Sequence, residues 1–307
     1  MGEISKIAWT DATFNPWWGC TRVSPGCEHC YAEQLATVRR KLPVWGVDAD
    51  RKPMSDGYWL APHRWNIRSR DARNHARAKG LPVPRRTRVF CASMADVFEI
   101  VPPRNVAANE VVSNGRARLW KLIAETPELD WLLLTKRPEN VRPLAPWRST
   151  SEDILRPAWP DNVWLGVTAE DQRRADERLA VLMKIPARVR FASHEPALEM
   201  VDFRPWYTYA DGTCRRGLDW IITGGESGSK ARPYDIRWAL DLLAHRNKGP
   251  IWRPYIFVKQ LGSNPHDGAL RVDPEPDTRI HLKDPKGGDP AEWPRGLAVR
   301  EHPPEGL

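Results

Sequence analysis

The chain of 307 residues contains no apolar run that approaches 18 residues, so we expect no transmembrane helix and no membrane partner. Its opening, MGEISKIAWTDATF, lacks the apolar core of a secretory signal, and we therefore expect a cytoplasmic protein. A G-x-G-x-x-G turn after the first strand and a P-loop are also missing, which counts against the common nucleotide-binding folds. A composition of 41% hydrophobic and 28% charged residues excludes a wholly disordered chain.

Cysteine is scarce, with five residues in all, and an odd number in a cytoplasmic chain argues against a disulfide framework. Three of them, Cys20, Cys27 and Cys30, follow the spacing C-x6-C-x2-C. Two cysteines two residues apart can hold one metal centre from a tight turn, and Pro25-Gly26 supplies a bend that can bring the first cysteine back beside them. The cluster therefore predicts a metal site.

The number of ligands favours iron and sulfur over zinc. Structural zinc sites are usually closed by four protein ligands, whereas a [4Fe–4S] cluster held by three cysteines leaves one iron free for a small molecule. A Cys3His zinc knuckle that uses His29 is an alternative, although ligation between two ligating cysteines would be strained. Unrelated cysteines are a third interpretation. We expect Cys91, in an apolar strand, and Cys214, in a polar loop, to take no part in the site.

The net charge of +8 lies in one segment. Residues 64–88 hold nine basic residues and one acidic residue, which leaves 38 of each sign in the rest of the chain. A localised cationic segment predicts a polyanionic partner, most simply nucleic acid, and Trp65 could stack on an unpaired base. The alternative is a solvated surface loop that is rich in arginine.

Short apolar segments recur along the chain and alternate with helical patterns. The segments are 89–92, 131–135, 163–168, 189–193, 220–223 and 256–260, with a further short strand expected before Cys20. Helices are expected from the spacing of apolar residues over 31–42, 104–126 with a break at Asn114-Gly115, 175–183 with Thr168 and Asp171 as a capping box, and 236–244. Continuous apolar strands between helices indicate a parallel sheet covered on both faces. We predict an α/β fold that forms a full or partial (β/α) barrel, with an open doubly wound sheet as the alternative.

Two segments lack a clear periodic apolar face. Residues 43–88 are rich in Pro, Trp and Arg, and we expect them to form a basic insertion poor in helix and strand. Residues 262–307 are dominated by Pro, Gly and Asp, and we expect an extended arm packed on the barrel domain of residues 1–261.

Polar residues follow the strands at their carboxyl ends, which is where the chemistry of a βα barrel takes place. They are Ser93, Asp96, Thr135, Lys136, Arg137, Thr168, Glu170, Ser193, Glu195, Thr223, Glu226, Lys259 and Gln260. Six strands that end in this way predict one shared pocket. Ordinary capping of strand-to-helix turns is the alternative, and it explains Thr168 at least.

Several motifs together resemble one family, the three-Cys-motif phage proteins, which occur in bacteriophages, prophages and bacteria. The motifs are WTDATFNP at 9–16, the cysteine segment ending CYAE at 30–33, LTKRP at 134–138, WLGVT at 164–168, Glu195-Pro196, GGESG at 224–228, ARP at 231–233, VKQ at 258–260 and KGG at 286–288. That family is similar to radical SAM enzymes, with spore photoproduct lyase as a comparatively near relative. The resemblance thus implies a barrel of the radical SAM kind in a bacterial or phage-infected host cell.

The resemblance also implies an activity. Cys20, Cys27 and Cys30 would hold a [4Fe–4S] cluster whose free iron binds S-adenosylmethionine. Reductive cleavage would then give methionine and a 5′-deoxyadenosyl radical that abstracts hydrogen, plausibly from a base or sugar of nucleic acid. An electron donor such as flavodoxin or ferredoxin would be needed. The cofactor supplies the difficult chemistry, and the barrel orients it and excludes water.

Roles for individual residues follow from this interpretation. We assign Lys136, Glu195, Glu226 and Lys259 to catalysis and the following residues to cofactor binding: His29, Tyr31, Ser93, Asp96, Thr135, Thr168, Glu170, Gly224 and Gly225. Two features depart from the radical SAM pattern. The first spacing is six residues where three are usual, and Gly-Gly-Glu follows a late strand where the second is usual. A non-enzymatic phage protein that binds nucleic acid and holds a structural metal is the alternative function.

Overall fold

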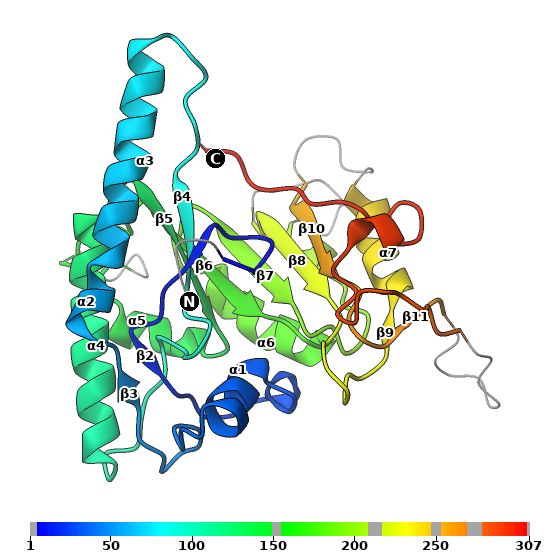
Figure 1. Cartoon of the computed structure of the whole chain (residues 1–307), viewed down its shortest axis with the longest axis horizontal. Helices are drawn as coiled ribbons and strands as arrows, with labels where there is room; N and C mark the ends of the chain where they lie inside the picture. Colours follow the sequence, from blue (N-terminus) through cyan, green and yellow to red (C-terminus); the bar gives the residue numbers. More distant parts are fainter. Residues whose placement is uncertain (1–4, 149–154, 208–216, 247–252, 269–277, 306–307) are drawn as a thin grey trace.

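The fold is built on one curled sheet of seven parallel strands (Figure 1). The computed structural model describes residues 5–148, 155–207, 217–246, 253–268 and 278–305. The strands are β1 (Ala12–Thr13), β4 (Thr87–Cys91), β5 (Leu129–Thr135), β6 (Val163–Thr168), β7 (Arg190–His194), β8 (Trp220–Gly224) and β10 (Tyr255–Gln260). Their spatial order follows the chain order from β1 to β10. A doubly wound sheet would reverse its order at one point, so the partial barrel is confirmed and the open alternative is wrong.

Both faces of the sheet are buried, which explains the continuous apolar strands. In β4, Val89 and Cys91 belong to the main core beneath the helices, whereas Phe90 belongs to a second cluster on the other face. Leu132 of β5 and Phe191 of β7 join Phe90 in that cluster. Alternate residues of each strand thus serve opposite faces, as the pleat requires.

Trp9 fills the inner face of the half-barrel. Its ring centroid lies 4.6 Å from that of Phe90, 6.3 Å from that of Phe191 and 6.0 Å from that of Trp220. Aromatic pairs at these separations add to the free energy gained by apolar burial. The sheet therefore closes over a packed aromatic core, and Trp9 and Phe90 of this core also border a cavity at the carboxyl ends of the strands.

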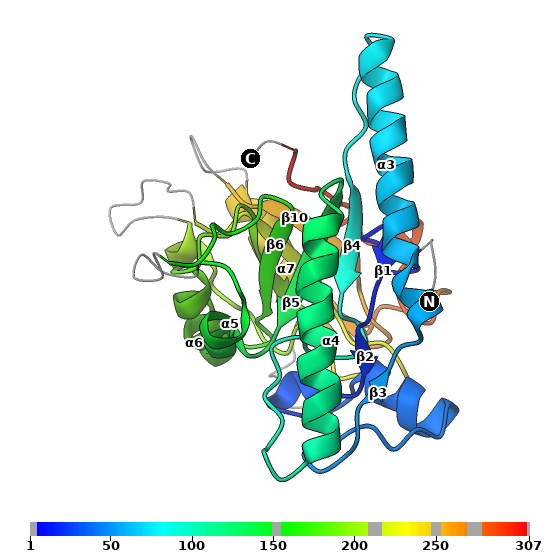
Figure 2. The same cartoon turned by 90° about the vertical axis from the view of Figure 1, so that its left-hand side faces the viewer.

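Helices cover the outer face of the sheet (Figure 2). They are α3 (Ala61–Ala78), α4 (Val106–Glu125), α5 (Val141–Leu144), α6 (Gln172–Leu182) and α7 (Ile236–Arg246). Helix α6 is capped by Asp171 alone, whose side chain accepts a hydrogen bond from Arg174 N, because Thr168 still belongs to β6. The break expected at Asn114-Gly115 is wrong: α4 is continuous. A Cβ at Gly115 would lie 2.8 Å from Trp17 Cε3, so the glycine makes room for an indole.

The expectation of little helix in residues 43–88 is wrong. This segment contains the short strand β3 (Lys52–Pro53), α2 (Asp56–Trp59) and α3, a helix of 18 residues. The sequence pattern did not indicate α3 because most of its residues are polar and few of them are buried. Trp65 is 5% exposed and packs in the main core, so it cannot stack on a base.

The C-terminal segment lies along the edge of the sheet. Val258 N donates to Val299 O at 2.8 Å, and Glu301 N donates to Ile256 O at 2.9 Å, so the chain end pairs with β10. Trp293 in this segment is buried in the main core. Two short strands, β9 (Tyr234–Asp235) and β11 (Pro265–His266), pair with each other. Within the described parts of the chain, no helix is both long and apolar enough to cross a membrane.

A glycine in β6 tests the packing of the inner face. A Cβ at Gly166 would lie 2.3 Å from Phe191 Cε2, in a cluster with no room to yield. We expect Gly166→Ala to lower the free energy of unfolding by about 1–3 kcal/mol in urea titrations. Gly57→Ala is the control, because nothing lies within 4 Å of a Cβ there, and it should not destabilise the protein. Equal stability of the Gly166→Ala and wild-type proteins would contradict this packing.

Candidate functional site

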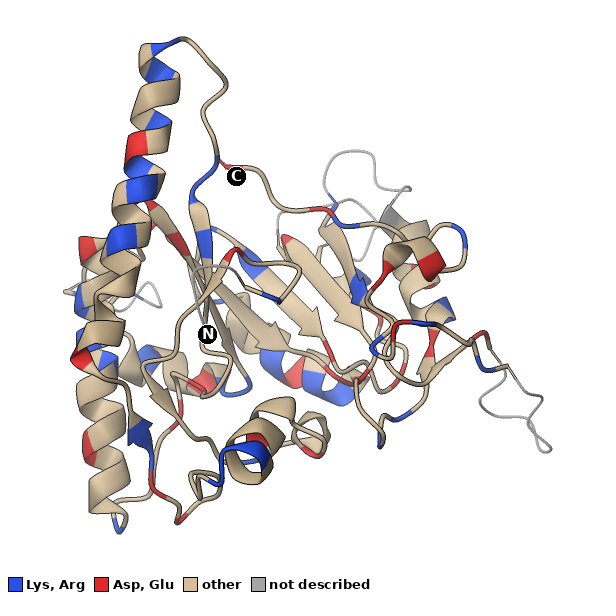
Figure 3. Ribbon diagram, in the orientation of Figure 1, with Lys and Arg blue, Asp and Glu red and all other residues tan. Residues whose placement is uncertain are grey.

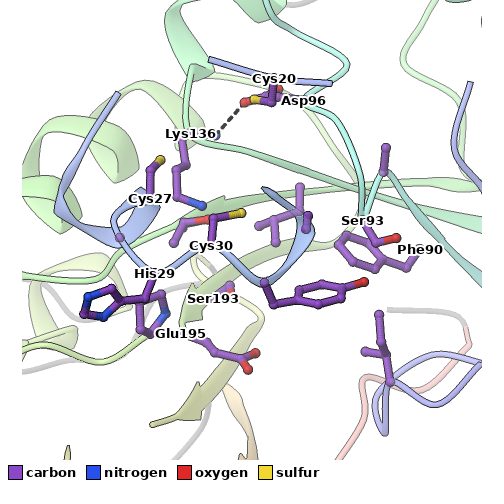
Figure 4. A pocket seen from close by; sticks show the side chains of 18 of the residues that line it. Cys20, Cys27, His29, Cys30, Phe90, Ser93, Asp96, Lys136, Ser193 and Glu195 are labelled. Carbon is purple, nitrogen blue, oxygen red and sulfur yellow. Dashed lines mark hydrogen bonds between the residues drawn. The ribbon is translucent and has the colours of Figure 1, made fainter. Parts of the chain in front are cut away.

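The three clustered cysteines line one cavity of about 630 Å³ at the carboxyl edge of the sheet (Figure 4). Pockets of this size are typical of small-molecule and cofactor sites. The expected site residues that line the same cavity are His29, Tyr31, Ser93, Asp96, Thr135, Lys136, Thr168, Glu195, Gly225, Glu226 and Lys259. The structure thus brings together residues that are up to 239 positions apart in the sequence.

Two expected residues lie behind the wall of the cavity. Glu170 is fully buried, and its Oε1 accepts a hydrogen bond from Gly26 N at 3.3 Å, beneath the cysteine loop. A Cβ at Gly224 would lie 2.8 Å from Gln260 O, so this glycine permits the close approach of β8 and β10. Neither residue is among those that line the cavity.

The loop that carries the cysteines is short and partly helical. It contains the 3-10 turn η1 (Pro25–Cys27) and continues through α1 (Tyr31–Glu33) into the π-helical turn η2 (Gln34–Arg39). A helix therefore begins at Tyr31 as expected. The apolar spacing over 31–42 overstates the buried face of this helix, because Val38 is 72% exposed. Arg22 forms two hydrogen bonds of 2.8 Å with Glu33, which close the outer side of the loop.

Arg232 and Glu226 hold the second half of the loop. Arg232 donates to both carboxylate oxygens of Glu226, and its guanidinium also contacts Pro25 O at 3.1 Å and Glu28 at 3.2 Å. Glu226 Oε2 lies 3.1 Å from His29 Nδ1. Burial alone would raise the pKa of Glu226, but the hydrogen bonds from Arg232 and His29 outweigh it and lower that pKa. Glu226 therefore ties the GGESG segment to the cysteine loop.

Asp96 connects two segments as Glu226 does. It lies in the segment after β4 and binds residues at the end of β5. It is buried and accepts hydrogen bonds from Thr135 Oγ1 at 2.8 Å, Lys136 N at 3.1 Å and Arg137 Nη1 at 2.9 Å. Thr135 and Asp96 thus hold each other and the start of the LTKRP segment. This position orients Lys136, which lines the cavity together with Cys27 and Cys30 (Figure 4).

Glu195 and Lys259 form an ion pair that also lines the cavity. Their side chains are 16% and 21% exposed, so the pair faces the cavity rather than bulk solvent. A lysine and a carboxylate side by side in a cleft can bind a zwitterion or exchange a proton with a bound group.

Sequence reasoning missed three of the arginines that support the site: Arg51, Arg178 and Arg232. Arg178 donates to Glu170 Oε2 at 2.6 Å, and Arg51 is 3% exposed and pairs with Glu99 at 2.9 Å. Arg137 was expected in the pocket and lines it, and Arg232 occurs in the quoted ARP motif, which is a usable signal. No pattern around Arg51 distinguishes it from the other arginines of its segment.

The donor set is compatible with a metal cluster. Three thiols from one loop face a single cavity, and soft thiolate donors are the ligands that iron–sulfur clusters require. No group of three or more His, Cys, Asp or Glu side chains among the described residues is placed to hold one metal ion. Cys91 is fully buried in β4, away from this cavity, and Cys214 lies outside the described residues.

The nine cations of residues 64–88 divide into two groups. Four are tied to the body of the protein: Arg73 pairs with Glu128 and Glu305, Arg85 with Asp11, Arg86 with Asp130 and Glu305, and Arg88 is 3% exposed with its guanidinium donating to Pro303 O. Five are exposed along α3 and at its end: Arg64, Arg68, Arg70, Arg77 and Lys79. Figure 3 shows the basic segments that follow one another along this helix. The exposed cations of α3 and its end are therefore about half of the cations that the sequence indicates. Arg85 is also exposed but is paired with Asp11.

His194, beside the cavity residues Ser193 and Glu195, gives a pH-dependent prediction. It is 1% exposed and lies between Glu199 O and Thr223 Oγ1, and burial lowers its pKa to about 4. Between pH 6.5 and 4 the unfolded chain binds a proton that the folded chain does not, so stability falls as pH falls. We expect His194 to contribute up to about 3 kcal/mol to this fall.

Urea titrations of the wild-type and His194→Gln proteins from pH 7 to pH 4 measure this contribution. The difference in unfolding free energy between the two should shrink as the pH falls. His75→Gln, on the exposed surface of α3, is the control and should keep the wild-type pH dependence. A constant difference between wild type and His194→Gln would show that His194 is not buried in its neutral form.

Comparison with known proteins identifies a family. No curated protein and no solved structure matches the chain. One family model matches residues 4–283, which is most of the sequence. The chain therefore belongs to the family described as "Protein of unknown function (DUF5131)".

Proposed function

We propose that this protein is a radical SAM-like enzyme in which Cys20, Cys27 and Cys30 hold a [4Fe–4S] cluster. The observation that carries the proposal is the placement of all three thiols on one cavity at the carboxyl edge of a parallel half-barrel. Three thiolates leave one iron without a protein ligand, which is where a small molecule can bind. The resemblance of the cysteine segment, LTKRP and GGESG to the three-Cys-motif phage proteins supports the same conclusion.

A cluster bound there would supply one electron for the cleavage of S-adenosylmethionine into methionine and a 5′-deoxyadenosyl radical. The protein's own residues would bind, orient and shield the reactants. Lys136 and the Lys259–Glu195 pair offer opposite charges for the amino and carboxylate groups of methionine. Below them, the aromatic cluster around Trp9 closes the inner face of the sheet and excludes water from the floor of the cavity.

The second candidate function is nucleic-acid binding without catalysis, and a specific observation favours it. In Figures 1 and 2, α3 extends beyond the edge at which the strands begin, whereas α1 and the cysteine loop lie at the other edge. A nucleic acid bound along the far end of α3 is thus separated from the cavity. We propose that α3 is a docking surface for nucleic acid under either function.

Iron content tests the ligands. After anaerobic reconstitution with iron and sulfide, wild-type protein should hold about four irons and be brown, with broad absorbance near 400 nm. Cys27→Ala should lose most of this iron, and Cys91→Ala should retain it, because that thiol is fully buried in β4. Full iron retention by Cys27→Ala, or a colourless protein that contains zinc, would contradict the proposed cluster.

Turnover tests the activity itself. Incubation of reconstituted protein with S-adenosylmethionine and dithionite should release 5′-deoxyadenosine, which chromatography detects. Cys27→Ala is the matched control and should release none above the background of reagents alone. Equal release by both proteins would show that cleavage does not depend on this site.

Salt dependence tests the docking surface. If four or five of the exposed cations of α3 contact phosphates, the log–log slope of duplex DNA affinity against salt should be roughly −3.6 to −4.5. Replacing Arg64, Arg68, Arg70 and Arg77 with Ser should flatten the slope and weaken binding. Arg73 is left unchanged because its ion pairs with Glu128 and Glu305 are structural.

The control replaces four exposed cations on other surfaces with Ser: Arg104, Arg173, Lys184 and Arg295. It removes the same formal charge, so only a change specific to the α3 variant supports the proposal. Equal weakening by both variants, or an affinity that is independent of salt, would remove the basis for α3 as the docking surface.

A further inference from the structure

Arg137 joins three separate parts of the site. It follows Lys136 at the end of β5 and is 7% exposed. Its Nη1 lies 2.9 Å from Asp96 Oδ2 and 3.7 Å from Cys20 Sγ, and its Nη2 donates to Thr21 O at 2.7 Å. One guanidinium thus contacts a buried acid, a thiol and the backbone next to that thiol.

Buried acids fix the position of this guanidinium. Asp96 pairs with it directly, and Glu99, which is 1% exposed, lies 3.7 Å from it. Glu99 also pairs with Arg51, whose Nη2 donates to Thr21 Oγ1 at 3.0 Å. Thr21 is therefore held on its carbonyl by one arginine and on its hydroxyl by another. A buried charge network of this kind is rigid only when every member is satisfied.

A hydrogen bond from a cation distinguishes Cys20 from Cys27. Cys27 Sγ lies 3.9 Å from Ser24 Oγ, which is a neutral hydroxyl. Cys20 Sγ faces a delocalised cation that keeps its charge at every physiological pH. A cation that donates a hydrogen bond to a ligating sulfur stabilises the more negative, reduced form of an iron–sulfur cluster.

We propose that Arg137 is a positioning residue that holds the Cys20 end of the loop and, through its hydrogen bond to Cys20 Sγ, raises the reduction potential of the cluster. This inference rests on the proposed function for its redox part. Its positional part concerns the protein without metal and does not depend on the cluster.

Arg178 provides a matched control. It has the same exposure as Arg137, 7%, and pairs with the buried Glu170, which holds Gly26 in the same loop. It differs in the one property under test, because its donors reach Glu170 and Thr168 O and not a sulfur. Arg137→Lys and Arg178→Lys therefore each remove one buried guanidinium group and keep its positive charge.

The redox test is an anaerobic titration of reconstituted protein. Arg137→Lys should lower the equilibrium constant for one-electron reduction by about tenfold, which corresponds to about 59 mV. Arg137→Gln, which also removes the charge, should lower it further. Arg178→Lys should leave it within about twofold of the wild type. Equal effects of Arg137→Lys and Arg178→Lys, or no effect of Arg137→Lys, would overturn the redox part.

The positional test uses metal-free protein, so a failure of the proposed function cannot affect it. Amide hydrogen exchange of residues 19–22 should be at least about tenfold faster in Arg137→Lys than in the wild type. In Arg178→Lys the faster exchange should centre on residues 25–27, next to Glu170. If Arg137→Gln does not fold, Arg137→Lys alone decides both parts. Unchanged exchange of residues 19–22 in Arg137→Lys would overturn the positional part.

Discussion

The site depends on buried or partly buried pairs between arginines and carboxylates, each of which fixes one part of the cysteine loop. Arg137 and Asp96 hold the Cys20 end, Arg178 and Glu170 hold the turn at Gly26, and Arg232 and Glu226 hold the end near His29. Loss of one partner would leave a buried charge unpaired, which is far more costly than the net stability that such a pair contributes. These pairs therefore secure the geometry of the loop more than the stability of the fold.

The sheet supplies the frame for those pairs. Because all seven strands are parallel and follow one another in order, their carboxyl ends meet at one edge, and Asp96, Glu170 and Glu226 all come from the segments that follow strands there. Burial of alternate strand residues on opposite faces fixes the register of each strand, since a slip by one residue would exchange the two faces. The fold thus places the acids at one edge of the sheet, where the arginines pair with them.

The strands and most helices could be predicted because their signal is local. Six apolar segments became six strands, and most of the polar residues after them line one cavity. Helix α3 was missed because only Trp65 and a few small residues face the core, so its apolar stripe is narrow. The sequence also could not predict which arginines are buried against a carboxylate and which are exposed. Arg73 and Arg77 look alike in sequence, yet one is buried against Glu305 and the other is exposed, and that difference depends on a segment more than 200 residues away.

The central claim is that three cysteines hold one cluster whose remaining iron binds a small molecule. Electron paramagnetic resonance of dithionite-reduced protein, recorded with and without S-adenosylmethionine, tests it most directly. The account predicts the signal of a reduced [4Fe–4S] cluster that changes shape when S-adenosylmethionine is added and is lost in Cys27→Ala. A signal that S-adenosylmethionine leaves unchanged, or one that survives in Cys27→Ala, would contradict it.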